Sequence, residues 1–205
     1  MNDDLTMRKV PQQKRSKERV DHILSVAETL FAQFGYDSVT TNQIAERAGV
    51  SVGSLYQFFP NKDALKEALI NRYLEEMRQD KFSLNTNQPI SRIVREMVGS
   101  TFAFSQRHAG FHNLFLSQFA SARLHEQVME GIYGMLGKVY PEMSETGRFQ
   151  CAFMGVAIVK GIIAMSSDRP DIAQETLLDE IVRALLAYLR AVLLLEGISI
   201  PRDIA

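Results

Sequence analysis

The apolar positions near the start of the chain repeat with the period of an α-helix. Between residues 20 and 34 they recur at spacings of three and four, which places them on one helix face. Gly35 follows directly and is suited to end this helix, because glycine adopts C-cap backbone conformations without strain. The face consists of Val20, Ile23, Leu24, Ala27, Leu30, Phe31 and Phe34.

Two short helices are predicted next. Thr40, with Gln43 three residues later, is typical of a capping box, in which each side chain satisfies an exposed amide at a helix start. Gly49 stands where a left-handed residue ends a helix, and Ser51 can cap the helix that follows. The predicted helices cover 41–48 and 52–58. Such a hairpin also occurs in all-α proteins that do not bind DNA.

Helical patterns continue along the rest of the chain, and no strand pattern competes with them. Asn61 can cap a fourth helix that reaches about residue 78, and the polar segment 83–88 is typical of a loop or linker. Further helices are predicted over 89–107, 111–117, 121–139, 146–166 and 172–196. The prediction is an all-α protein of about nine helices. Its parts are a basic flexible arm (1–18), a three-helix helix-turn-helix domain (19–64) and a helical effector-binding and dimerisation domain (65–205).

The composition is that of an ordered globular protein. Hydrophobic residues make up 46% of the 205 residues and charged residues 23%, outside the range of disordered chains. The single cysteine, Cys151, cannot form an intrachain disulfide and lies in an apolar run, which indicates a buried thiol. No apolar signal core is present at the N-terminus, and charges interrupt the apolar stretches 151–165 and 181–195. We therefore expect a cytoplasmic protein with no membrane segment.

Positive charge is concentrated near the N-terminus, although the net charge of the chain is −1. Between residues 8 and 19 six basic side chains accompany one acidic side chain, Glu18. Such an excess suits a phosphate backbone, and it is equally compatible with a solvated tail. The basic residues are Arg8, Lys9, Lys14, Arg15, Lys17 and Arg19.

The predicted helix over 52–58 has the composition of a helix that enters the major groove. It alternates two candidate buried side chains, Leu55 and Phe58, with small or polar ones. A recognition helix needs little bulk near its backbone and needs donors and acceptors for base edges. Residues 40–65 resemble the TetR-family signature. They share its Thr-Thr start, Ile-Ala pair, Ala-Gly-Val-Ser turn, the Gly and Tyr of the third helix, and the Phe-x-x-Lys-x-x-Leu exit.

This resemblance implies a dimeric transcriptional repressor that binds double-stranded, palindromic operator DNA and is released by a small, partly apolar effector. By matching position, Thr41, Tyr56 and Lys62 would contact phosphates, with Tyr56 as a core aromatic being the alternative. The resemblance places bases or groove walls against Val52, Gly53, Ser54 and Gln57, and it places Thr40 and Asn42 in the same DNA-binding set. Two recognition helices about 34–36 Å apart read two half-sites on one face of the duplex.

The resemblance also implies that the last two helices pair with those of a second copy. The predicted dimer seam is Leu178, Ile181, Leu185, Leu189 and Val192; the alternative is an interior helix of a monomer. An effector site is hypothesised at Phe102, Phe115, Met129, Tyr133 and Met154, although such side chains also build ordinary cores. Gly131, Gly134 and Gly137 each cost a helix roughly 1 kcal/mol, which calls for close helix packing or room for a ligand.

Other chemistries find little support in the sequence. It contains no phosphate-binding loop, nucleophile elbow or His-Glu-x-x-His motif, so neither an enzyme nor a cofactor is predicted. His108 and His112 have a chelating spacing, but Gly110 between them argues against a helix there, and no metal is predicted. Alternatives within the helix-turn-helix class are a DNA-binding assembly or scaffold factor, or an activator, without small-molecule control.

Overall fold

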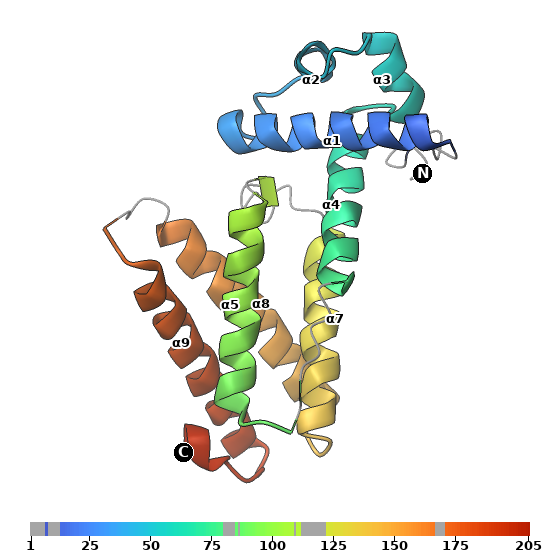
Figure 1. The fold of residues 1–205 in the computed structure, drawn as a ribbon. Helices are drawn as coiled ribbons and strands as arrows, with labels where there is room; N and C mark the ends of the chain where they lie inside the picture. Colours follow the sequence, from blue (N-terminus) through green and yellow to red (C-terminus); the bar gives the residue numbers. More distant parts are fainter. Residues whose placement is uncertain are drawn as a thin grey trace. The chain divides into compact units, whose positions relative to one another are not determined.

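The computed structural model describes residues 7, 13–79, 85, 87–108, 110, 111, 122–166 and 171–205 (Figure 1). Every regular element in these residues is helical, which confirms the all-α class. The α-helices are α1 (Lys14–Phe34), α2 (Thr41–Arg47), α3 (Val52–Phe58), α4 (Lys62–Gln79), α5 (Ile90–Arg107), α7 (Ala122–Val139), α8 (Glu145–Ser166) and α9 (Gln174–Leu195). A 3-10 helix, η1 (Arg202–Ile204), follows α9. The helix predicted over 111–117 falls almost wholly outside the described residues.

The chain divides into two compact units. The first unit comprises Met1–Phe82 with Ser105–Ser121, and the second comprises Ser83–Phe104 with Ala122–Ala205. The domain boundary predicted between residues 64 and 65 falls inside α4, which continues without a break to Gln79. The first unit therefore contains all of α4 and also the end of α5.

The first helix begins earlier than its apolar face. Residues 14–18, predicted to belong to the flexible arm, form the first turns of α1, and the amides of Ser16 and Lys17 donate to the carbonyl of Gln13. The buried positions of α1, which produce the hydrophobic pattern, start only at Val20. A helix propagates beyond its buried part because each added residue gains a backbone hydrogen bond after nucleation.

The caps of the short helices are those predicted from the sequence. Thr40 and Gln43 form both bonds of the capping box, and the Ser51 hydroxyl accepts from the amide of Ser54 at 3.1 Å. Gly49 has φ of 64°, the left-handed conformation expected for it. The Asn61 side chain accepts from the amide of Ala64 at 2.8 Å. Local side chains thus satisfy the helix starts and set the α2–turn–α3 geometry.

The core of the first unit lies where α1 packs against α2 and α4, and α2 against α3. Truncation of a residue such as Leu55, which has no exposed surface, would cost about 2–5 kcal/mol. The His22 ring also contacts the carbonyl of Ala48 at 3.2 Å and so joins α1 to the end of α2. The fully buried members of this core are Ile23, Ala27, Phe31, Ile44, Ala45, Leu55, Phe59, Leu65, Leu69, Ile70 and Tyr73.

In the second unit α8 packs against both α7 and α9. Ser144 caps α8 and also bonds the carboxylate of Glu196, which follows α9, so the start of α8 lies beside the end of α9. These bonds lower the pKa of Glu196. Cys151 is buried, as predicted, and burial raises the pKa of its thiol to about 11. A protonated, enclosed thiol has little nucleophilic reactivity.

Of the three glycines of α7, only Gly137 lies close to a neighbouring helix. A Cβ at Gly131 or Gly134 would meet nothing within 4 Å, whereas one at Gly137 would lie 3.1 Å from the Arg148 guanidinium. A Cβ at Gly155 of α8 would be in ordinary contact with Ile132 and Leu185, at 3.8 Å from each. The packing hypothesis therefore does not explain Gly131 and Gly134 within the protomer.

Candidate nucleic-acid interface

Helix α3 presents the outer face expected of a recognition helix. Its apolar side chains Leu55 and Phe58 are buried, while Val52 and Tyr56 are 39% and 37% exposed. Gly53 and Gln57 are also exposed; Ser54 is half-buried, and its hydroxyl accepts from that of Ser51 at 2.9 Å. The structure thus separates the packing side chains of α3 from those predicted to reach bases.

Two predicted phosphate contacts meet on this surface. The hydroxyls of Thr41 and Tyr56 are 2.9 Å apart and join the start of α2 to α3. Tyr56 is therefore not the core aromatic that was the alternative. Asn42 is exposed beside this pair, and Thr40 is exposed while its side chain is engaged in the capping box. Paired hydroxyls at a helix start suit hydrogen bonds to one phosphate.

Replacing Tyr56 by phenylalanine is expected to weaken DNA binding about tenfold or more with little change in stability. The variant loses one hydroxyl, and a hydrogen bond to a charged group contributes about 1.5–3 kcal/mol. The side chain is exposed, so the fold loses less than about 1 kcal/mol. Fluorescence anisotropy on selected operator DNA measures the affinity and thermal unfolding the stability. Equal affinities of the variant and the wild type would contradict the contact.

Lys62, the third predicted phosphate contact, is engaged within the protein. Its ammonium donates to the carbonyls of Tyr36 and Asp37 at 2.8 and 3.3 Å and lies 4.4 Å from the Tyr36 ring centroid. The Tyr36 hydroxyl donates to Asp63 at 2.7 Å. The pKa of Tyr36 is raised, mainly because the side chain is buried and secondly because of this hydrogen bond. The buried Lys66 donates to the same carboxylate oxygen at 2.8 Å. Lys62 therefore anchors the α1–α2 turn to α4.

Acid is expected to remove the contribution of Asp63 to this anchor. The hydrogen bond from Lys66, and to a smaller extent the one from Tyr36, lowers the pKa of the Asp63 carboxyl in the folded protein. A carboxyl group whose pKa is lower in the folded protein than in the unfolded chain stabilises the fold at pH values above its unfolded-state pKa, which is near 4. This contribution disappears as the pH falls through the pKa of the folded protein. Because Asp63 is half-exposed, we expect Asp63→Asn to cost about 1 kcal/mol or less at neutral pH. Thermal melts should show this difference shrinking below about pH 4; a difference that stays constant would contradict it.

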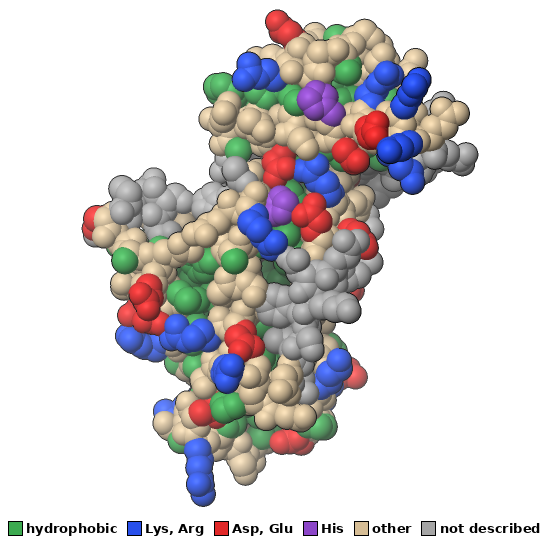
Figure 2. Space-filling model, viewed as in Figure 1, with side chains coloured by type: hydrophobic (Ala, Val, Ile, Leu, Met, Phe, Trp, Pro, Cys, Tyr) green, Lys and Arg blue, Asp and Glu red, His purple; other side chains and the backbone are tan. Residues whose placement is uncertain are grey.

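Basic side chains gather at the N-terminal end of α1 (Figure 2). Lys14, Arg15, Lys17 and Arg19 are all exposed. Lys14 forms an ion pair with Glu18 at 3.9 Å, which is also exposed and neutralises little of this charge. Arg8 and Lys9 lie outside the described residues. The described part of the basic segment is therefore a helical, positively charged surface of the first unit.

Four of the five residues of the hypothesised effector site lie in the second unit. Phe102 belongs to α5, Met129 and Tyr133 to α7, and Met154 to α8, and all four are half-buried. Phe115 lies outside the described residues. The packing of α7 against α8 brings two of these helices together, and the Arg148 guanidinium lies 6.0 Å from the Tyr133 ring centroid.

Most side chains of the predicted dimer seam on α9 are buried within the protomer itself. Ile181, Leu189 and Val192 are at most 5% exposed, and Leu178 and Leu185 are half-buried. The first three therefore belong to the core of their own unit and leave little surface for a partner. The periodicity of α9 identified an apolar face correctly but could not distinguish a protomer core from a dimer seam.

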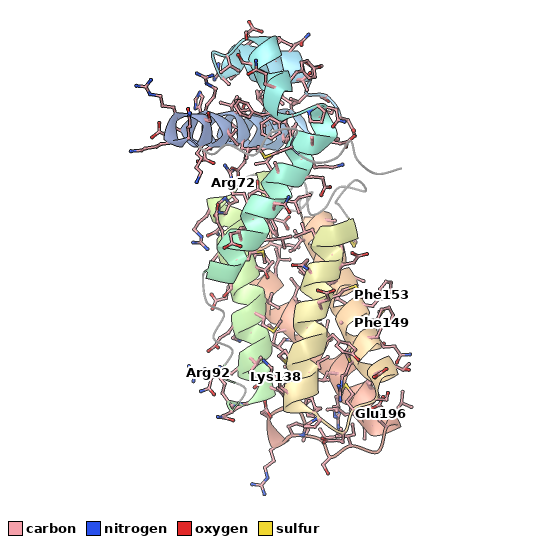
Figure 3. All side chains as sticks on the ribbon, turned by 90° about the vertical axis from the view of Figure 1, so that its right-hand side faces the viewer. Arg72, Arg92, Lys138, Phe149, Phe153 and Glu196 are labelled. Carbon is pink, nitrogen blue, oxygen red and sulfur yellow. The ribbon has the colours of Figure 1, made fainter. Side chains whose placement is uncertain are left out.

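An exposed apolar face lies instead on α8. Phe149 and Phe153 are 55% and 54% exposed, and their rings stack with centroids 6.2 Å apart (Figure 3). Leu194 and Leu195, at the adjoining end of α9, are also exposed. The segment Glu145–Met165 is long and apolar enough to cross a membrane by length and composition, and only 22% of its most apolar window is buried. Sequence reasoning missed Phe149 and Phe153, although their spacing of four was a usable signal.

The histidine pair considered for metal binding has other surroundings. His108 faces the carboxylates of Glu28 and Glu76, and His112 lies outside the described residues. Within the part of the chain that the structure describes, no group of three His, Cys, Asp or Glu side chains is placed to hold a metal ion.

Comparisons with known proteins match both parts of the chain. Residues 23–69 match the family of bacterial regulatory proteins of the tetR type, and residues 89–189 match a tetracycline repressor-like C-terminal domain. The HTH-type transcriptional repressor KstR2 of Mycolicibacterium smegmatis is 30% identical over 101 residues, 48% of each chain. The nucleoid occlusion factor SlmA of Vibrio campbellii is 26% identical over 120 residues, 56% of this chain and 61% of SlmA.

Solved structures also resemble the fold over most of the chain. A tetR-family transcriptional regulator from Streptomyces coelicolor superposes with a TM-score of 0.71 at 22% identity, over 88% of this chain and 86% of that one. The aligned region spans only about half the length of the first curated relatives. The two family models together cover the helix-turn-helix and most of the C-terminal helices. The chain belongs to the TetR family of bacterial transcriptional regulators.

Proposed function

We propose that this protein is a non-catalytic, cytoplasmic repressor that binds a palindromic operator as a dimer and is released by a small effector. The observation that carries the proposal is the exposed surface of α3, with Gly53 and Gln57 free of the core and the Thr41–Tyr56 hydroxyl pair beside them. This surface combines phosphate-contacting hydroxyls with a low-bulk helix face, as major-groove recognition requires. Relatives such as KstR2 are named as transcriptional repressors.

Selection of bound fragments from random DNA tests the proposal. The expected result is a palindrome whose half-site centres are about one helical turn apart. Gln57 and Ser54 are the side chains assigned to sequence readout, so Gln57→Ala should relax the preference at one position of each half-site. Recovery of fragments without a common palindrome would contradict dimeric operator binding.

The proposed dimer uses the exposed face of α8 together with the end of α9. Phe149, Phe153 and Leu194 replace Ile181, Leu189 and Val192 as the central apolar contacts, because only exposed side chains can be buried by a partner. Aromatic side chains of this size are the usual anchors of protein interfaces. The same need for a partner explains why α8 is apolar enough to resemble a membrane span.

The proposed effector site lies among α5, α7 and α8, at Phe102, Met129, Tyr133 and Met154. These side chains would accept a partly apolar molecule. If effector and operator favour different conformations of the dimer, each weakens the binding of the other by the same factor. Metabolite screening by operator release, followed by both titrations, tests this linkage. Alanine variants at these positions should change the effector response and leave operator affinity unaltered.

The alternative function is a DNA-binding assembly factor without small-molecule control. It draws support from the similarity to SlmA, a nucleoid occlusion factor. Operator binding that no metabolite alters would favour this alternative. A transcription assay on the selected operator separates repression from activation, because an activator would raise transcript levels from the same site.

A further inference from the structure

A cluster of charged side chains joins three segments of the first unit. Glu28 comes from α1, Arg72 and Glu76 come from α4, and His108 follows the end of α5. One ring nitrogen of His108, Nδ1, lies 3.3 Å from Glu28, and the other, Nε2, lies 2.9 Å from Glu76. Arg72, labelled in Figure 3, also bonds Glu28 and lies 3.8 Å from Glu76. His108 thus stands between a carboxylate of α1 and a carboxylate of α4.

The fit around this cluster is close. The Tyr73 hydroxyl, in a fully buried side chain, donates to Glu28 at 2.8 Å, and its ring meets those of His108 and Phe111 edge-on. A Cβ at Gly110 would lie 2.7 Å from the Glu28 side chain and 2.9 Å from the Tyr73 hydroxyl. No larger residue fits there without movement of its neighbours. The segment that carries His108 is therefore seated at one position on α1 and α4.

The hydrogen-bonding chemistry of the cluster depends on one proton. An ionised carboxylate only accepts hydrogen bonds, and a neutral imidazole has one donor and one acceptor nitrogen. With both ring nitrogens facing carboxylates, only the imidazolium can donate to each. In the neutral ring a nitrogen lone pair would face a carboxylate oxygen. The two carboxylates also favour a cationic ring over a neutral one by direct electrostatic attraction.

We propose that protonated His108 is a positioning residue that holds α1 against α4 and seats the 105–111 segment on the DNA-binding unit. Deprotonation removes one of the two hydrogen bonds that the ring donates to these carboxylates and loosens that seat. The described charged and titratable groups around the ring are Glu28 on α1, Arg72, Tyr73 and Glu76 on α4, and the neighbouring Arg107 on α5. Of these side-chain types, histidine is the one that ordinarily changes charge between about pH 5 and 8.

Hydrogen exchange of the full-length protein without DNA tests the proposal. Exchange is followed by mass spectrometry at about pH 5.5 and about pH 8.5, either side of ordinary imidazole titration, with times scaled for the intrinsic rate. In the wild type, peptides covering 66–76 and 105–111 should be about tenfold better protected at the lower pH, the change expected for one charged hydrogen bond. His108→Gln should behave at both pH values like the wild type at high pH. Glu76→Gln should lose the same low-pH protection.

His22→Gln is the matched control, because His22 is the exposed histidine of α1 and should leave the pH difference intact. Three outcomes would overturn the proposal: equal wild-type protection at both pH values, an equal loss in His108→Gln at both, or loss of the difference in His22→Gln. An equal loss at both pH values would mean that His108 acts only by packing. A fall of operator affinity as the pH rises is expected only if the proposed function is correct. The exchange measurement is made without DNA and does not depend on that function.

Discussion

Replacing Gly53 by glutamate is expected to abolish operator binding, at least a hundredfold, while the protein stays folded. Gly53 is exposed in the first turn of α3, and a Cβ there would meet nothing within 4 Å. A glycine inside a helix costs about 1 kcal/mol relative to a better helix former, so the substitution should slightly raise stability. On DNA the added carboxylate would enter the surface that approaches phosphates and bases, where repulsion and steric conflict act together.

Two variants separate these effects. Gly53→Ala adds only a methyl group, so it should stabilise α3 with a much smaller loss of affinity. Gly134→Glu adds the same charge at an exposed helical glycine of the second unit and should leave operator binding unchanged. Anisotropy titrations and thermal melts of the three proteins measure both quantities. Retained affinity in Gly53→Glu would show that α3 does not enter the groove.

Replacing Phe149 and Phe153 together by glutamate is expected to yield folded monomers that bind the operator weakly. Both rings are more than half exposed in the protomer, so the change removes little of its core. In a dimer the four carboxylates would lie in an apolar interface, where unpaired charges cost several kcal/mol each. Loss of the second half-site contact should then lower operator affinity by a hundredfold or more, because one helix-turn-helix makes only half of the contacts.

Sedimentation velocity reports the oligomeric state, and far-ultraviolet circular dichroism reports the fold. Gly134→Glu again serves as the control for added negative charge. If the double variant sediments as the wild type does, α8 does not form the dimer interface. A variant that becomes monomeric yet binds the operator with unchanged affinity would show that operator binding does not require the dimer.

The helix-turn-helix was predictable because its determinants are local. The Thr40–Gln43 capping box, the left-handed Gly49 and the Asn61 cap act within a few residues of themselves, and the structure contains each as predicted. The matching Thr-Thr, Gly and Tyr positions also carried the family assignment, which the comparisons confirm. The boundaries were less accurate: the start of α1 at Lys14 left no apolar trace, because its first turns are exposed.

For the residues that the structure describes, the sequence alone determined which segments become helices and which side chains of α3 face outward, and it determined the family of the chain. Periodicity marks an apolar face but carries no information on what covers it, so only the tertiary structure assigned Ile181 and Val192 to the protomer core and left Phe149 exposed. The same holds for Glu28, Glu76 and His108, which are distant along the chain. Packing of α1 on α4 brings the two carboxylates together, and the segment after α5 adds the imidazole, so their chemistry arises only from that proximity.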